Sequence, residues 1–313
     1  MATSSDQQVR PIFTDKEHYF KALTHFTSKS DNLEVIQSWV DSEDFGPAIL
    51  DKMELLLKSP EDELRMLGVG SGSGDMELIF LKKLLTRLMN IEACVLEPCR
   101  DLISKYQDLV DANEKDLEGI EYEWRQQSLE EYGQTCRYFE EGPKFHFISV
   151  VHSIYYVNEL ESALKLLHGM LEPGGALLIT IVTEDTGLGL IWKTFPDLVQ
   201  PTAEEGAASG CPTSRPNHRR NSTQVKEALN KLKIEYTSYN YTVRTDIGSC
   251  LEDQSTPESH LVLDFLAHTV NFHESAPEKL QEDFLKCLKE KCVELKDGIS
   301  YFLNKMDVFV IYG

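Results

Sequence analysis

Residues 64–75 read LRMLGVGSGSGD, an apolar run that breaks into alternating glycines. A helical pattern follows, with apolar residues at positions 78, 79, 81, 84 and 85. A strand, a glycine turn and a helix in this order are how an α/β protein presents its backbone to a nucleotide. Glycine adopts backbone angles closed to other residues, and a ligand approaches its main chain without meeting a Cβ. The stretch therefore predicts a nucleotide-binding turn in a doubly wound α/β fold.

Two kinds of nucleotide site use such a turn. A dinucleotide fingerprint would place a third glycine where this chain has Ser73, whereas the GxGxG of residues 70–74 is the first motif of S-adenosylmethionine (AdoMet) methyltransferases. A second apolar run, residues 93–96, ends in Glu97, and a carboxylate there suits two hydrogen bonds from ribose hydroxyls. The P-loop lysine of nucleoside triphosphate sites is absent from the motif. The two motifs together predict an AdoMet site.

Composition narrows the class of partner. The chain has 313 residues, with 31 Lys and Arg against 52 Asp and Glu, which gives a net charge of −21. Such a surface repels phosphate backbones and anionic membranes, so nucleic-acid and membrane partners are not expected. The polar start lacks a signal peptide and no window reaches about 18 apolar residues, which predicts a cytoplasmic protein. The His and Cys residues lack metal-ligand spacing, so we expect no metal.

The order of the elements predicts two regions. Residues 1–60 carry helical patterns and are expected to form a helical cap over the site, and residues 61–313 to form an AdoMet-binding domain with an insertion near 198–220. Alternating strands and helices predict a mostly parallel sheet that one antiparallel strand completes. The expected strands are 64–69, 92–96, 120–124, 145–151, 176–182, 234–241 and the antiparallel 307–312. The expected helices include 45–57, 158–171, 222–232, 261–269 and 277–293, with a tight turn at 173–175.

Ligands of such sheets bind beyond the carboxyl ends of the strands. Gly70 and Gly72 follow the first strand, and Glu97 follows the second. Ser128 lies in a turn after the third strand, which either flanks an adenine or is an ordinary polar turn.

The fourth strand is followed by His152, which we expect to hydrogen-bond a methyl acceptor or take a proton from it. Tyr155 and Tyr156 are expected to form an aromatic wall, or else to pack under the cap. Trp192, just past the fifth strand, belongs to the same argument.

The chain resembles the histamine N-methyltransferase family. The resemblance rests on the glycine motif, on Val95-Leu96-Glu97-Pro98, on Ile154-Tyr155-Tyr156-Val157, and on Asp264-Phe265-Leu266 with Asn271-Phe272. It runs from about residue 13 to residue 311, and it implies a cytosolic, monomeric class I methyltransferase (a Rossmann-like fold) that converts AdoMet to S-adenosylhomocysteine. By position, the resemblance implies that Gly70, Glu97 and Val151 bind the cofactor. It also implies a pocket for a small-molecule acceptor that contains Tyr19, Tyr155, Tyr156, Trp192, Phe265 and Asn304.

Three positions depart from the family pattern. The acidic residue that holds the substrate amine in the family appears here as Asn32, with Asp31 beside it, and two family glutamines appear as His152 and Leu102. An ammonium group held by Asn32 would lose a charge-assisted partner, at a cost of about 1–3 kcal/mol.

We therefore predict an AdoMet-dependent N-methyltransferase that acts by in-line methyl transfer. Its acceptor would be histamine, a related amine, an imidazole without the charged tail or another heteroaromatic nitrogen. The alternative is a catalytically silent, methyltransferase-like protein that binds AdoMet without turnover.

Overall fold

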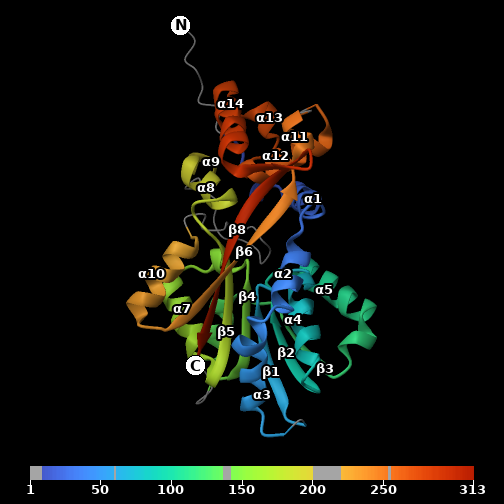
Figure 1. The fold of residues 1–313 in the computed structure, drawn as a ribbon, viewed down its shortest axis with the longest axis vertical. Coiled ribbons are helices and arrows are strands. Elements are labelled where there is room, and N and C mark those ends of the chain that lie inside the picture. The colour runs from blue at the N-terminus through green and yellow to red at the C-terminus, as the bar shows by residue number, and fades with distance from the viewer. Residues whose placement is uncertain (1–8, 60, 137–141, 200–219, 253–254) are drawn as a thin grey trace.

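The structure is a computed structural model that describes residues 9–59, 61–136, 142–199, 220–252 and 255–313. Within these residues, eight strands form one sheet that runs through the molecule, with helices on both of its faces (Figure 1). The strands are β1 (Glu63–Val69), β2 (Asn90–Leu96), β3 (Ile120–Arg125), β4 (Phe145–Val151), β5 (Leu171–Val182), β6 (Tyr236–Asp246), β7 (Val293–Lys296) and β8 (Ile299–Tyr312).

The strand order confirms the predicted doubly wound sheet. It runs β3-β2-β1-β4-β5-β8-β6, and β7 pairs with β8 beside this row. Strands β1 to β5 are parallel, whereas β8 is antiparallel to both β5 and β6. The chain reverses its direction of winding between β1 and β4, and the crevice at such a switch point is where ligands bind.

The helices fall into two groups, those on the faces of the sheet and those beyond the carboxyl ends of its strands. They are α1 (Lys16–Thr27), α2 (Asn32–Val40), α3 (Asp51–Leu56), α4 (Asp75–Leu85), α5 (Arg100–Ala112), α6 (Leu129–Cys136), α7 (Leu160–Gly169), α8 (Gly187–Thr194), α9 (Pro196–Val199), α10 (Ser222–Leu232), α11 (Gly248–Glu252), α12 (Pro257–Ala267), α13 (Phe272–Ser275) and α14 (Glu278–Cys287).

The two faces of the sheet are buried by different helices. On β1, Leu64 and Met66 pack in a cluster with residues of α2, α3 and α4, and Leu67 and Val69 pack in a second cluster with residues of α6, α7 and α10. Alternate side chains of a strand point to opposite faces, so a strand buried on both sides reads as a continuous apolar run. This is why the runs at β1, β2, β4 and β5 were recognisable in the sequence.

A layer of helices lies beyond the carboxyl ends of the strands, at the upper end of Figure 1. It contains α1, α8 and α11 to α14, with α1 packed along α12. Backbone hydrogen bonds fasten the N-terminal stretch to the segment after α12, from the Ile12 N–H to the His268 carbonyl (2.9 Å) and from the Val270 N–H to the Arg10 carbonyl (2.8 Å). We call α1 and α12 with these segments the lid. The other N-terminal helices, α2 and α3, pack on a face of the sheet.

Several element boundaries differ from those expected. Strand β8 begins at Ile299, not at residue 307, because it continues beyond the central sheet to pair with β6 and β7. Strand β6 likewise extends to Asp246. The expected turn at 173–175 is part of β5, where the pairing with β4 shifts register. Residues 200–219 of the expected insertion lie outside the described residues.

Two expected helices also differ. The expected helix 45–57 divides into a π-helical turn (Gly46–Leu50) and α3. The expected helix 277–293 also divides into two elements. Helix α14 ends at Cys287, and a π-helical turn (Leu288–Cys292) follows it.

Candidate functional site

The turn between β1 and α4 is built from glycines in left-handed backbone conformations. Gly70 has φ +64° and Gly72 has φ +59°, a region that costs other residues about 1–2 kcal/mol. A Cβ on Gly70 would lie 2.5 Å from the Ser153 Cβ, so this position is closed to side chains by contact as well as by conformation. A Cβ on Gly72 would meet nothing within 4 Å. The main chain at Gly72 therefore faces open space that a ligand is able to fill.

Glu97 follows β2 and points back to this turn. It is buried, with 5% of its surface exposed, and Oε2 accepts a hydrogen bond from the Gly72 N–H at 2.9 Å while Oε1 accepts one from the Cys99 N–H at 2.8 Å. Burial raises the pKa of the Glu97 carboxyl, and the two backbone donors act in the opposite direction. Each carboxylate oxygen retains a further lone pair for a second donor. The group is thus held in place and able to accept two ligand hydroxyls, which fits a ribose.

A second buried carboxyl lies beneath the same turn and was missed in the sequence. Glu77 of α4 is 5% exposed, and its Oε1 accepts a hydrogen bond from the Ser149 hydroxyl at 3.2 Å. It occupies the space that a side chain on Gly68 would need, because a Cβ there would lie 1.8 Å from Glu77 Oε1. Burial raises its pKa to about 7. In the sequence, Glu77 reads as an ordinary polar residue in the first turn of a helix.

Two further residues expected at the cofactor, Val151 and Ser128, lie in different surroundings. Val151 is the last residue of β4, where it pairs with Thr180 of β5, and it is half-buried. Ser128 precedes α6 and caps it, since its hydroxyl accepts from the Glu131 N–H (3.2 Å) and its own N–H donates to the Glu131 carboxylate (2.7 Å). This reciprocal pattern is a capping box, so Ser128 has a structural function whether or not it flanks a ligand.

His152 begins the turn after β4 in a left-handed conformation, with φ +52°. Its N–H donates to the Thr180 carbonyl at 3.1 Å, and its ring Nε2 is buried without a hydrogen-bond partner among the described residues. Burial lowers the pKa of the ring to about 4, so the imidazole is neutral near pH 7. A base this weak holds a proton poorly, so the low pKa favours hydrogen bonding to a ligand over proton transfer.

The expected aromatic residues meet in one cluster with three side chains that the sequence did not single out. Tyr156 lies beside Tyr19 of the lid, and burial raises the pKa of both phenols. The Tyr155 hydroxyl accepts from the Val182 N–H at 3.0 Å, and its ring meets the edge of Trp192 at 5.7 Å between centroids. Phe265 stacks on Phe26 at 4.6 Å.

His268 connects these rings. It follows α12 in a left-handed conformation, and its ring centroid lies 5.2 Å from that of Phe13, 5.6 Å from Trp192 and 6.0 Å from Phe265. Phe13 in turn lies 5.0 Å from Tyr19, so the contacts run without a break from the turn after β4 to the lid. We refer to Phe13, Tyr19, Phe26, Tyr155, Tyr156, Trp192, Phe265 and His268 as the aromatic cluster. His268 was missed because a histidine after an apolar helix reads as a simple helix end.

The two asparagines of the expected site lie on different elements, Asn304 on β8 and Asn32 on α2. The Asn304 Oδ1 on β8 accepts from the Leu188 N–H at 3.1 Å and so supports the start of α8, which carries Trp192. Asn32 is the first residue of α2, and its Oδ1 is buried without a hydrogen-bond partner among the described residues. Its neighbour Asp31 is turned toward β6, where Oδ1 accepts from the Arg244 N–H at 2.7 Å. Asp31 is therefore committed to the backbone of β6.

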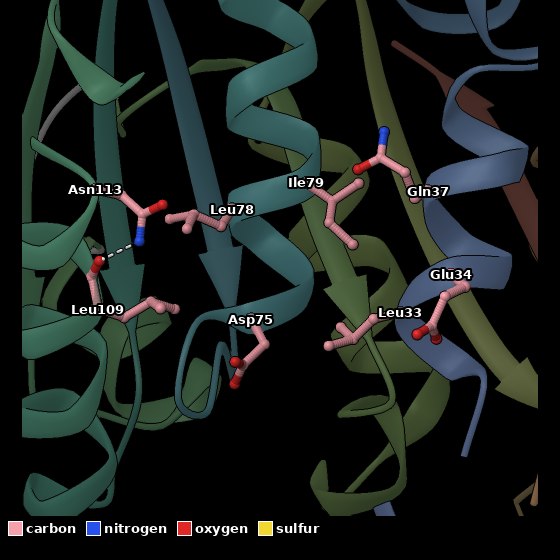
Figure 2. Close-up of a pocket in the computed structure, with 8 residues that line it drawn as sticks. All are labelled: Leu33, Glu34, Gln37, Asp75, Leu78, Ile79, Leu109 and Asn113. Carbon is pink, nitrogen blue, oxygen red and sulfur yellow. Dashed lines mark hydrogen bonds between the residues drawn. The ribbon is translucent and has the colours of Figure 1, made fainter. Parts of the chain in front are cut away.

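A surface hollow of about 380 Å³ lies apart from these residues, on the outer side of α4 between α2 and α5 (Figure 2). It is lined by Leu33, Glu34, Gln37, Asp75, Leu78, Ile79, Leu109 and Asn113. Asp75 comes directly after the glycine turn, but none of the expected site residues lines the hollow. The site instead follows the hydrogen bonds and ring contacts at the carboxyl ends of β1, β2 and β4.

Two features are absent from the part of the chain that the structure describes. Three or more His, Cys, Asp or Glu side chains do not come together there in a metal-binding arrangement. None of the helices there is both long enough and apolar enough to span a membrane.

The sequence is similar to known methyltransferases. Residues 42–243 match a family described as a methyltransferase domain. Histamine N-methyltransferase of Mus musculus is 28% identical over 309 residues, covering 97% of each chain, and that of Bos taurus is 26% identical over 306 residues, covering 97% of this chain and 98% of the relative. Carnosine N-methyltransferase 2 of Gallus gallus is 27% identical over 290 residues, covering 89% of this chain and 85% of the relative. The family match includes the glycine turn, Glu97 and the turn after β4.

Proposed function

The chain belongs to the methyltransferase domain family that its residues 42–243 match, and from this membership we propose that it transfers a methyl group from AdoMet to a nitrogen of a small amine or imidazole-type acceptor. Its sheet order, with one reversed strand, is the class I arrangement expected above. The observation that carries the proposal is the position of Tyr156. Tyr156 follows Ser153 by three residues in one turn, and the Ser153 side chain packs against Gly70 while its hydroxyl donates to the Val69 carbonyl at 2.5 Å. The ribose-type carboxylate and the aromatic cluster are therefore neighbours.

On the AdoMet side, the support comes from the glycine turn and Glu97. The backbone at Gly72 is open to a ligand, and the Glu97 carboxylate beside it has acceptor capacity left for two ribose hydroxyls. AdoMet supplies a methyl group that is already activated as part of a sulfonium. The task left to the chain is to bind, to orient the acceptor and to exclude water.

On the acceptor side, the aromatic cluster supplies an apolar enclosure. Tyr155, Trp192 and Phe265 are each less than 10% exposed, which keeps water away from the reacting atoms. Tyr19 and Phe13 reach the same cluster from the N-terminal part of the lid. In this proposal, lid closure completes the enclosure after the acceptor enters.

His152 is proposed to orient the attacking nitrogen. The nitrogen must enter with a free lone pair, and a neutral imidazole acceptor has one such nitrogen and one N–H. If that N–H donates to Nε2 of His152, the opposite lone pair is directed away from His152 and is free to attack. Because its pKa is about 4, the His152 ring is neutral near pH 7, and the tautomer with its proton on Nδ1 presents Nε2 as a hydrogen-bond acceptor. The proton released from the acceptor after transfer passes to solvent.

Two observations narrow the chemical class of the methyl acceptor, namely the names of the relatives and the residues at positions 31 and 32. The relatives are named for histamine and carnosine, and both compounds contain an imidazole ring. Asn32 offers an uncharged oxygen where the family resemblance implies a carboxylate, and Asp31 is bound to β6. We therefore propose an imidazole-type acceptor whose recognition depends less on an ammonium tail than it would with a carboxylate at position 32.

The test is a methyl-transfer assay with purified protein and AdoMet. Histamine, carnosine and 4-methylimidazole are offered separately, and methylated products are identified by mass spectrometry. We expect a product methylated on a ring nitrogen, with 4-methylimidazole within about tenfold of histamine in kcat/KM, because Asn32 does not supply the charge-assisted contact to the ammonium tail, which would favour histamine by about 1–3 kcal/mol. The Asn32→Asp variant is expected to favour histamine over 4-methylimidazole.

Two results would contradict the proposal in different ways. Stabilisation of the fold by AdoMet with no methylated product from any acceptor would support the silent, AdoMet-binding alternative. The absence of AdoMet binding by calorimetry would remove the proposed role of Gly72 and Glu97.

A further inference from the structure

Arg220, which precedes α10 by two residues, has a buried guanidinium. The residue is 7% exposed, and its guanidinium donates to three main-chain carbonyls in the turn after β4. Nη1 donates to the carbonyls of Val157 and, at 3.4 Å, Tyr155, and Nη2 donates to the carbonyl of Asn158 at 2.5 Å. The acidic side chains Glu130 and Glu159 act on it at longer range. One side chain thus gathers three carbonyls of a single turn.

The turn held by Arg220 carries the acceptor-side residues. Residues 154–156 form one turn of 3₁₀ helix that contains Tyr155 and Tyr156, and it closely follows His152. The same turn touches the AdoMet side, because the Ser153 side chain packs against Gly70. A displacement of this turn would therefore move the acceptor wall relative to the glycine turn.

Other contacts hold the same turn from the opposite side. The Ser153 hydroxyl donates to the Val69 carbonyl at 2.5 Å, and the Tyr155 hydroxyl accepts from Val182 of β5. The Asn158 N–H donates to Glu130 of α6 at 2.7 Å. Strands β1 and β5 thus hold Ser153 and Tyr155 at the start of the turn, and α6 holds Asn158 at its end. Arg220 binds the main-chain carbonyls of the same turn.

The geometry of these contacts favours a positioning function over ligand binding. A guanidinium presents its donors in a rigid planar fork, which suits several fixed acceptors, whereas a lysine ammonium is a point charge on a flexible stem. Because its donors are directed to carbonyls in a buried position, the Arg220 side chain is not presented to an anionic ligand. Misplacement of a reacting group by about 1 Å is able to lower a rate about a hundredfold.

We propose that Arg220 is a positioning residue for methyl transfer, which holds the turn of Tyr155 and Tyr156 in register with the AdoMet side. This inference rests on the proposed function for its kinetic consequence. Its structural consequence, a turn that is fixed by the guanidinium, does not depend on which acceptor is used.

The kinetic test uses Arg220→Lys, with Arg220→Gln as a second variant if the first is poorly folded. We expect the Kd for AdoMet to stay within about twofold of wild type, while the acceptor KM rises and kcat falls, lowering kcat/KM at least about tenfold. A third variant, Arg220→Ala, removes the side chain altogether. Free guanidinium chloride at millimolar concentration is expected to take the place of the missing group and restore part of the activity. Lys231→Met, on the exposed side of α10, is the matched control and should behave as wild type.

The structural test measures hydrogen–deuterium exchange of the segment 153–158 in the same proteins without any acceptor. We expect exchange in this segment to be at least about tenfold faster in Arg220→Lys than in wild type, with unchanged exchange in β1. The proposal is overturned if exchange in the segment is unchanged. It is equally overturned if AdoMet affinity, acceptor kinetics and melting temperature all fall together with no rescue by guanidinium. If wild type methylates no acceptor, the proposed function fails, while the exchange result still decides the role of Arg220.

Discussion

The Glu97 carboxylate accepts a hydrogen bond from the Gly72 N–H, with 2.9 Å between Oε2 and N, and so joins the end of β2 to the turn after β1. The side chain thereby orders the turn and presents its remaining acceptor capacity in the same crevice. Loss of the carboxylate should affect both the order of the glycine turn and the binding of AdoMet. The first two predictions change the carboxylate and the turn one at a time.

Glu97→Gln should weaken AdoMet binding about 10- to 150-fold, because a hydrogen bond to a charged group contributes about 1.5–3 kcal/mol. The amide keeps the shape of the side chain but replaces one acceptor oxygen with a donor. Titration calorimetry with AdoMet measures the effect, and Glu121→Gln on the exposed edge of β3 is the control. Equal affinity in the wild type and the Glu97 variant would exclude the ribose role.

Gly72→Ala should abolish tight AdoMet binding while costing about 1–2 kcal/mol of stability from its positive φ. Gly298→Ala is a matched control, since Gly298 also has a positive φ (+80°) and a Cβ on it would likewise meet nothing within 4 Å. The melting temperature should fall by a similar amount in both variants. Only Gly72→Ala should lose affinity for AdoMet. If the two variants bind AdoMet with the same affinity, the ligand does not lie against residue 72.

His152→Gln should shift acceptor preference toward histamine, because a glutamine amide offers both a donor and an acceptor at this position. Since the pKa of His152 is about 4, the wild-type pH profile should show no inflection from this ring near neutral pH. The measurements are kcat/KM for histamine and for 4-methylimidazole as a function of pH, with His168→Gln on α7 as the control. An unchanged ratio of the two acceptors would place His152 outside the pocket.

Glu77→Gln should flatten the pH dependence of stability. The folded pKa of about 7 lies above the usual value of 4.5, so the folded state binds the proton more tightly. Stability from this group is therefore full below pH 4.5 and is lost as the pH rises through 7, by up to about 3 kcal/mol. Urea unfolding at pH 5 and pH 8 should show the variant gaining on wild type at the higher pH. A difference that does not change with pH would mean that Glu77 does not ionise in this range.

Four strands of the parallel sheet, β1, β2, β4 and β5, were predictable because each is buried on both faces. The run at β4 is largely apolar and was predicted with its observed bounds. Strand β8 was predicted only from residue 307, since residues 299–305 mix polar and apolar side chains, of which only Phe302 and Asn304 are buried. Strand β7 was missed because it is four residues long and half of it is exposed.

The parts of the candidate site that belong to a local sequence motif were predictable. The parts that depend on contacts between distant segments of the chain were not. The glycine turn and the position of Glu97 follow from local sequence alone. His268, Glu77 and Arg220 gain their significance from partners far away in the chain, such as Phe13, Ser149 and Val157. Such pairings leave no periodic signal, so they are visible only in the folded chain.

The position of β6 has a consequence for assembly. In the described sheet β6 is joined to the other strands through β8 alone, and the residues between the two strands form α11 to α14 and β7. The far edge of the sheet therefore cannot form until the chain has closed this long loop, which is the slow kind of step in folding. Because the loop itself contains much of the upper helical layer, that layer and the sheet edge should be acquired together, as one cooperative unit with a single unfolding transition.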